Sequence, residues 1–173
     1  MHRLLIFGLV CAMTAPLVHA RAIPNPAQRH APGNEAPQKP IADAGYSVGV
    51  NYQLQCAGCH LGNGMGSPAN DTPRMTGFVG NFLKVPGGRE FLVRVPGMSQ
   101  SALNNAQLAD LLNWLLREDG MAGTSMPANY QPYSTEEVTR LRAATMLNLP
   151  GTRAELIKAM RAQGIAIEDG MGN

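Results

Sequence analysis

Aromatic residues, net charge and cysteine are all scarce in this chain of 173 residues. Phe, Trp and Tyr make up only 5% of the residues, which is little for a core built from side chains alone. A large flat cofactor would supply the missing volume, and so would Leu, Met and Ala. The net charge is only +2 with His neutral, whereas nucleic-acid binding requires a strongly basic face. The composition therefore gives no reason to expect a nucleic-acid partner.

The N-terminal residues have the pattern of a secretory signal peptide. A weakly positive start precedes an apolar run over residues 4–16, and residues 18–20 (VHA) form a small-x-small cleavage site. A membrane anchor needs about 20 apolar residues, and Thr14 and Pro16 interrupt this run. We therefore expect cleavage of residues 1–20, export to the periplasm and no stable membrane anchor.

The rest of the chain divides by composition into three parts. Residues 21–43 carry five prolines and almost no large apolar side chain, so they cannot bury enough surface to offset the entropy of ordering. We predict a flexible arm there, followed by a domain over residues 44–117 and a helical C-terminal extension over residues 118–173.

Helical periodicity dominates the domain. A short helix is predicted over residues 44–55, with apolar residues at spacings of four (Tyr46, Val50, Leu54). A clearer helix is predicted over Asn104–Arg117, where leucines recur at i, i+3, i+4 and i+7. Asn104 is a good N-cap and Gln107 stands three residues later. Residues 88–95 suit either a short helix or a strand.

The extension carries two further helix starts. Ser134 with Glu137 and Thr152 with Glu155 both match the spacing of a capping box, and Pro150-Gly151 is predicted to separate the two helices. Alternating strand patterns are scarce throughout the chain, so the predicted fold class is all-α.

The stretch "QCAGCH" places Cys56, Cys59 and His60 within five residues. A thioredoxin-like dithiol would need a preceding strand in a βαβ unit, which the helical surroundings do not offer. A structural zinc site needs four ligands, and His30 in the predicted arm is the other histidine beyond the signal peptide. Covalent attachment of c-type haem uses these residue types and this spacing, because two thiols add to the haem vinyl groups and the adjacent imidazole binds iron.

Residues 44–117 resemble the class I c-type cytochromes. The resemblance rests on "QCAGCH", on "TPRMTG" and on "GREFLVRVPGM" with "LNNAQLADLLNWLL", which is similar to the middle helix, methionine loop and closing helix of that family. It implies a helical fold around one covalently bound haem c. By the same resemblance, the Pro73 carbonyl accepts a hydrogen bond from His60, Met75 packs on the haem, and Trp114 occupies the family's aromatic position.

The sequence leaves the distal iron ligand open. Met98 lies between the predicted middle and closing helices, where the family places its ligand, but no proline follows it. Met126 is followed by Pro127, as in the family loop, but it comes after the closing helix. Met75 and Met65 are further alternatives.

We therefore expect an electron-transfer protein and not an enzyme: a periplasmic monohaem cytochrome c that exchanges single electrons with a dehydrogenase, an oxidase or a membrane electron-transfer complex. Two alternatives remain. The protein is a haem enzyme or gas sensor if its sixth coordination site is open or displaceable, or a dedicated haem subunit of a periplasmic dehydrogenase or oxidase. A basic cluster (Arg74, Lys84, Arg89, Arg94) would steer an acidic partner or simply face solvent.

Overall fold

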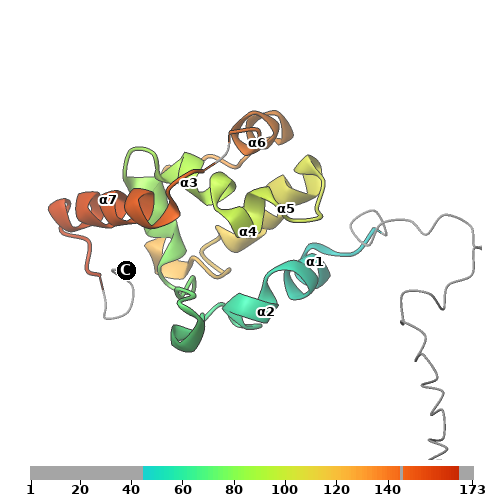
Figure 1. Ribbon diagram of the computed structural model, residues 1–173, viewed down its shortest axis with the longest axis horizontal. Coiled ribbons are helices and arrows are strands. Elements are labelled where there is room, and N and C mark those ends of the chain that lie inside the picture. The colour runs from blue at the N-terminus through green and yellow to red at the C-terminus, as the bar shows by residue number, and fades with distance from the viewer. Residues whose placement is uncertain (1–44, 145, 168–173) are drawn as a thin grey trace, which may run out of the picture. The chain divides into compact units, whose positions relative to one another are not determined.

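A computed structural model describes residues 45–144 and 146–167. These residues belong to one compact unit, Lys39–Asn173. The predicted signal peptide, the predicted arm with His30, and Cys11 lie outside the described residues. The helices, with 3-10 helices marked η, are α1 Val48–Gln55, α2 Ala57–His60, η3 Pro68–Asn70, η4 Val79–Lys84, α3 Gly88–Arg94, α4 Pro96–Ser99, α5 Asn105–Leu115, η5 Gly123–Ser125, α6 Thr135–Arg142 and α7 Leu149–Ala162 (Figure 1).

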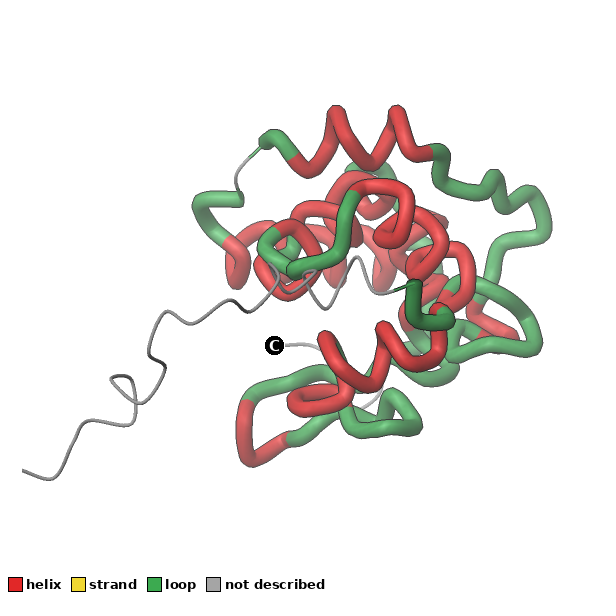
Figure 2. Tube along the Cα trace, turned by 90° about the vertical axis from the view of Figure 1, so that its right-hand side faces the viewer, coloured by secondary structure: helices red, strands yellow, loops and turns green. Residues whose placement is uncertain are grey.

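The all-α prediction is confirmed for the described residues. Figure 2 shows these residues as helices and connecting loops with no strand, and the extended pairing within them is an isolated bridge between Ser67 and Thr72. Residues 88–95, which suited a helix or a strand, contain helix α3. No helix in the described part of the chain is long and apolar enough to cross a membrane.

Helix α5 begins where the sequence predicts. The Asn104 side chain accepts a hydrogen bond from the Gln107 backbone N–H, and the Gln107 side chain accepts one from the Asn104 backbone, which completes a capping box. The four leucines of its apolar face are all buried (Leu108, Leu111, Leu112, Leu115). This helix is central because it packs against α1 on one side and α6 on another.

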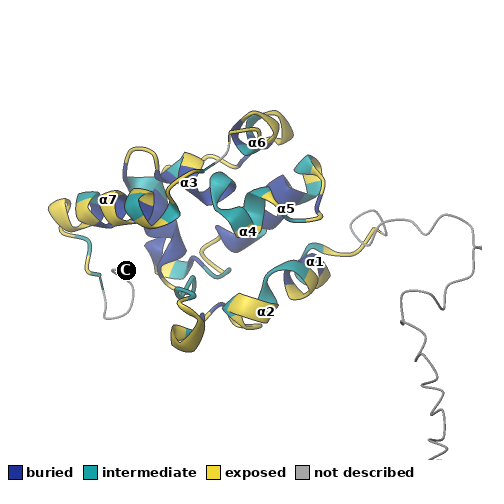
Figure 3. Ribbon diagram, in the orientation of Figure 1, coloured by how far each residue is buried: buried dark blue, intermediate teal, exposed yellow. Residues whose placement is uncertain are grey.

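Helix α1 starts later than predicted, at Val48, because Ser47 caps it by accepting from the Val50 N–H. Its apolar residues at spacings of four do not form the buried face. Tyr46, Val50 and Leu54 are 45%, 41% and 52% exposed, whereas Tyr52 is completely buried. Figure 3 shows exposed positions along α1 and α2 and buried ones concentrated on α3, η4 and α5.

The two helices of the extension are present, but one boundary differs from the prediction. Ser134 caps α6 by accepting from the Glu137 N–H, as predicted. The prediction that α7 starts at Thr152 is wrong, because Asn148 accepts from the Gly151 N–H and Pro150 lies in the first turn. Proline is tolerated there since the first-turn N–H groups have no partner within the helix. Pro150 and Gly151 therefore begin α7 instead of preceding it.

Aromatic rings join the middle of the chain to this core. The Phe82 ring of η4 stacks on the Phe91 ring of α3 with centroids 4.9 Å apart, and Phe78 meets Phe82 edge-on at 6.0 Å. Helix α7 packs against both η4 and α3, where it buries apolar side chains of its own (Leu156, Ile157, Met160). The extension is therefore part of the same hydrophobic core.

Candidate functional site

The Cys-x-x-Cys-His motif lies on a tight junction between two helices. Cys56 ends α1 and begins α2, with its N–H donating to the Tyr52 carbonyl at 2.9 Å and its carbonyl accepting from the His60 N–H at 3.0 Å. Both thiols are free; Cys56 is half-buried and Cys59 is exposed. Burial raises the pKa of the Cys56 thiol to about 11. The junction thus holds two thiols and one imidazole within about one helical turn.

A backbone carbonyl orients the His60 ring. Its Nδ1 lies 3.2 Å from the Pro73 oxygen, and because a carbonyl only accepts, Nδ1 carries the proton and donates. Burial lowers the pKa of His60, and the hydrogen bond to Pro73 opposes that shift. The neutral ring leaves the lone pair of Nε2 free for a metal, which is the usual arrangement of a metal-binding histidine.

The glycine-rich loop after His60 brings Pro73 back to the ring. The Gly66 N–H donates to the His60 carbonyl at 3.0 Å, and the backbones of Ser67 and Thr72 exchange two hydrogen bonds. Gly66 has a φ of +72°, and a Cβ there would lie 2.4 Å from the Thr72 oxygen and 2.7 Å from the Pro73 carbonyl carbon. A side chain at Gly66 would therefore displace the carbonyl that orients His60.

Trp114 packs against the helix that leads into the motif. Its ring centroid lies 5.6 Å from that of Tyr52, and the Tyr52 hydroxyl donates to the Leu61 carbonyl at 2.6 Å. Burial is the main cause that raises the pKa of Tyr52 to about 12. The sequence reasoning missed Tyr52, although its place one helical turn before Cys56 was a usable signal.

Met98 lies in α4, half-buried and packed against the core. The segment that follows it, residues 99–104, turns back at once: the Ser101 N–H and hydroxyl both donate to the Met98 carbonyl, at 3.3 and 2.9 Å. The Ala102 N–H donates to the Gln55 side chain at 3.4 Å. Since Gln55 directly precedes Cys56, this contact ties the segment after Met98 to the start of the Cys-x-x-Cys-His motif.

The other methionines lie in different surroundings. Met126 lines a pocket of about 400 Å³ together with Asn113, Leu116 and Tyr130. Met75 is half-buried, and its N–H donates to the Gly64 carbonyl at 2.8 Å, on the loop that carries Pro73. Met65 is 45% exposed. Met121, which the sequence reasoning did not consider, places its sulfur 2.7 Å from where a Gly64 Cβ would be.

Several residues of the basic cluster bond to other groups of the protein, and Arg94 donates to the Ala144 carbonyl at 3.1 Å. Arg89 forms a two-pronged ion pair with Glu137 at 2.6 and 2.7 Å and donates to the Gln131 carbonyl at 2.7 Å. The Lys84 ammonium donates to the Asn81 side chain at 2.9 Å. Arg89 thus joins α3 to α6, which weakens the hypothesis that this cluster steers an acidic partner.

Comparison with known proteins decides the family. The chain is 33% identical over 113 residues to cytochrome c-552 of Thermus thermophilus, a match that covers 55% of the chain and 84% of the relative. A second cytochrome c-552 from the same species matches at the same identity over 74% of its length. The chain is a class I c-type cytochrome. No model of a protein family matches it.

Membership of the class I c-type cytochromes fixes the cofactor and the general role. The cytochrome carries covalently bound haem c and takes part in electron transfer. The residues present fit this cofactor, since two unpaired thiols and a histidine with a free Nε2 lie together at one helix junction. The dithiol alternative required a strand before the motif, and the structure has helix α1 in that place.

Proposed function

We propose that this cytochrome is a periplasmic monohaem electron carrier in which Cys56 and Cys59 attach the haem and His60 and Met98 bind the iron. Bound haem c supplies a one-electron ferric/ferrous couple whose potential depends on its axial ligands and surroundings. Two hydrogen bonds at the ends of residues 55–60 carry the proposal. The Pro73 carbonyl orients His60, and the Gln55 side chain holds the segment that follows Met98.

The contacts of the methionines favour Met98 as the distal ligand. The backbones of Met75 and Met121 are both bonded to the loop that carries Pro73. The Met75 N–H donates to the Gly64 carbonyl, and the Met121 carbonyl accepts from the Gly77 N–H at 2.7 Å. These two methionines therefore lie with the proximal loop, and the ligand opposite His60 should come from another segment. Met126 faces a pocket whose lining includes neither Cys56 nor His60. Met75 then keeps the packing role that the family resemblance implies for it.

The protein's contribution to electron transfer is to hold both ligand-bearing segments in place. Hydrogen bonds fix His60 through Pro73 and fix residues 99–104 through Gln55. Trp114, packed on Tyr52, fills the space beside α1. We expect segments held in this way to keep the cofactor in one orientation, which suits exchange of electrons with partner proteins. The expected partners are a periplasmic dehydrogenase, an oxidase or a membrane electron-transfer complex.

Absorption spectra of the exported protein test the ligand assignment. The wild-type protein should show a c-type spectrum that survives acid-acetone extraction, and its ferric form should have the weak red band of iron bound to thioether sulfur. Met98→Ala should abolish that band, whereas the matched variant Met126→Ala should keep it. If only Met126→Ala lost the band, Met126 would be the distal ligand instead of Met98. Rapid binding of carbon monoxide by the reduced wild-type protein would instead favour the haem enzyme or gas sensor.

Fractionation of the native host tests the location. The mature protein should be recovered in the periplasmic fraction, and its N-terminus should begin after Ala20. Retention of residues 1–20 on a membrane-bound product would contradict both the proposed cleavage and the absence of an anchor.

A further inference from the structure

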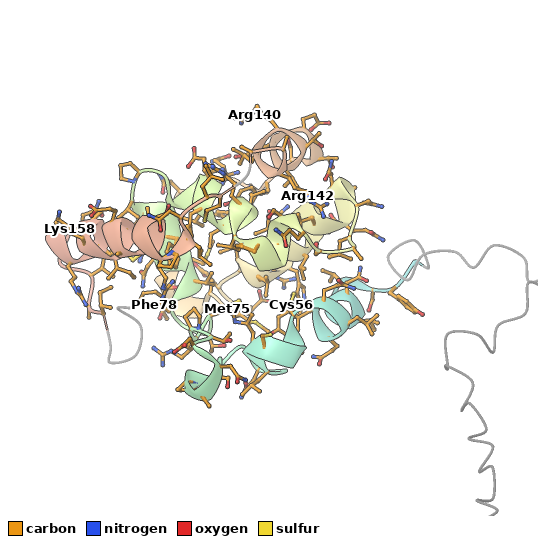
Figure 4. All side chains as sticks on the ribbon, viewed as in Figure 1. Cys56, Met75, Phe78, Arg140, Arg142 and Lys158 are labelled. Carbon is orange, nitrogen blue, oxygen red and sulfur yellow. The ribbon has the colours of Figure 1, made fainter. Side chains whose placement is uncertain are left out.

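Arg142, the last residue of α6, makes an unusual set of contacts. Its half-buried guanidinium donates to three alternate backbone carbonyls, at 2.7, 2.5 and 2.6 Å, and to the Asn105 side chain at 3.1 Å. The three carbonyls belong to Ser99, Ser101 and Leu103. In Figure 4, Arg142 lies between α6 and α5, whereas Arg140 lies on the outer side of α6. One side chain of the C-terminal extension thus binds most of the segment between α4 and α5.

This segment, residues 99–104, directly follows Met98. The carbonyls that Arg142 binds face one side of the segment, and on another side the Ala102 N–H donates to Gln55. Its far end is fixed by the capping box of Asn104. A planar guanidinium with five donors matches such a set of carbonyls better than a lysine ammonium does. Without Arg142, three partly buried carbonyls would lose a charged donor. The segment would keep its hydrogen bonds to Gln55 and to the Met98 carbonyl, the cap at its far end and the buried Leu103 side chain.

A second arginine gives the matching comparison. Arg89 also joins the domain to the extension, through Glu137 and the Gln131 carbonyl, and its guanidinium lies 3.9 Å from the centre of the Tyr133 ring. The contacts described for Arg89 include none to residues 98–104. Removal of Arg89 should therefore lower the stability of the protein but remove none of the hydrogen bonds that Arg142 makes to Ser99, Ser101 and Leu103.

We propose that Arg142 is a positioning residue for the distal ligand: it holds residues 99–104 so that the Met98 sulfur stays on the iron and excludes small molecules from the sixth site. The inference rests on the proposed function, because it requires Met98 to be the ligand. By this proposal, the C-terminal extension helps to keep small molecules from binding at the sixth coordination site of the iron.

The experiment compares holoprotein variants Arg142→Met, Arg142→Lys and Arg89→Met with the wild type. Stopped-flow measurement of carbon monoxide binding probes the reduced form, and titration with imidazole probes the oxidised form. Arg142→Met should bind carbon monoxide at least tenfold faster and imidazole at least tenfold more tightly. Arg142→Lys should fall between it and the wild type. Arg89→Met should bind both ligands as the wild type does, although its melting temperature falls.

Two results would overturn the proposal, and only the second would also overturn the assignment of Met98 as the distal ligand. If the red band depends on Met98 but folded Arg142→Met binds both ligands like the wild type, the role of Arg142 is wrong and the ligand assignment stands. If the band survives Met98→Ala, both fail together. Should Arg142→Met not fold, Arg142→Lys decides the question: wild-type ligand binding in that variant contradicts the proposal, and faster binding supports it.

Discussion

The orientation of the His60 ring depends on the close approach of two backbone segments. Pro73 presents its carbonyl 3.2 Å from Nδ1, and the chain reaches that point through a loop that passes against Gly66. Gly66 fits because it has no Cβ and because its φ of +72° is accessible to glycine without strain. At the scale of single residues, the site is therefore shaped by a position that carries no side chain.

We predict that Gly66→Ala is much more destabilising than Gly77→Ala. Gly77 has a similar φ of +69°, but a Cβ there would meet nothing within 4 Å. Gly77→Ala should thus cost only the left-handed backbone strain of about 1–2 kcal/mol. Gly66→Ala adds the clash with Thr72 and Pro73, roughly a further 1–3 kcal/mol. Denaturant unfolding of both holoproteins measures the difference, and equal losses would show that the loop yields to a side chain at Gly66.

Local chemistry also explains which site residues were predictable. Cys56, Cys59 and His60 lie within five residues, so their spacing alone places them on one helical turn and predicts their chemistry. The contact between His60 and Pro73 spans 13 residues and was reached only through the family resemblance. Gln55 and Arg142 carried no signal, because their partners are backbone groups 39 to 47 residues away.

At the scale of helices, start signals predict boundaries well when they do not compete. Asn104 and Ser134 each cap a helix as predicted. At α7 two signals competed: Thr152 with Glu155 suggested one start, and Asn148 before Pro150 supplied another. The earlier start prevails because Asn148 can cap the helix, Pro150 suits the first turn, and the additional turn extends a helix whose apolar side packs on η4 and α3.

The burial of α7 gives a prediction at this scale. Ile157 is 1% exposed, whereas Leu147, just before the helix, is 93% exposed. Ile157→Ala should lower the free energy of unfolding by about 2–5 kcal/mol, because it removes apolar contacts and leaves a cavity. Leu147→Ala should change it by less than about 0.5 kcal/mol. Thermal unfolding monitored by circular dichroism compares them, and a loss below about 1 kcal/mol for Ile157→Ala would mean that α7 is loosely attached.

At the scale of the whole described unit, the extension completes the molecule. Helix α6 packs on α5 and α3, and α7 packs on η4 and α3. Two arginines add polar contacts between the extension and the rest of the chain. Arg89 of α3 pairs with Glu137 of α6, and Arg142 of α6 donates to the Ser99 carbonyl in the segment after Met98. The extension therefore stabilises residues 45–117 through both apolar and charged contacts.

The ion pair of Arg89 and Glu137 makes stability depend on pH. The hydrogen bond from Arg89 is the largest cause that lowers the pKa of Glu137. A carboxyl whose pKa is lower in the folded state stabilises the protein above its unfolded pKa of about 4.3, and this stabilisation is lost as the pH falls through the folded pKa. The pair is partly exposed, with side chains 28% and 21% accessible, so its contribution should be about 1 kcal/mol.

Glu137→Gln should therefore be less stable than the wild type at neutral pH, and the difference should shrink between about pH 5 and pH 3. Denaturant titrations across this range provide the measurement. Glu155→Gln is the matched control, because Glu155 and Lys158 are 76% and 78% exposed and 3.7 Å apart, and it should have almost no effect. A difference for Glu137→Gln that stays constant down to about pH 3 would contradict the ionic contribution.

The sequence by itself determined the features that depend on neighbours along the chain: the Cys-x-x-Cys-His motif, the helical class, the caps of α5 and α6, and the loop after His60. These follow from residue spacing and local hydrogen bonding. Only the tertiary structure decided which methionine segment lies beside Gln55, that Arg89 is paired with Glu137, and that Arg142 binds residues 99–105. The physical reason is that such contacts join residues 37 to 48 positions apart, and packing, not local preference, selects them.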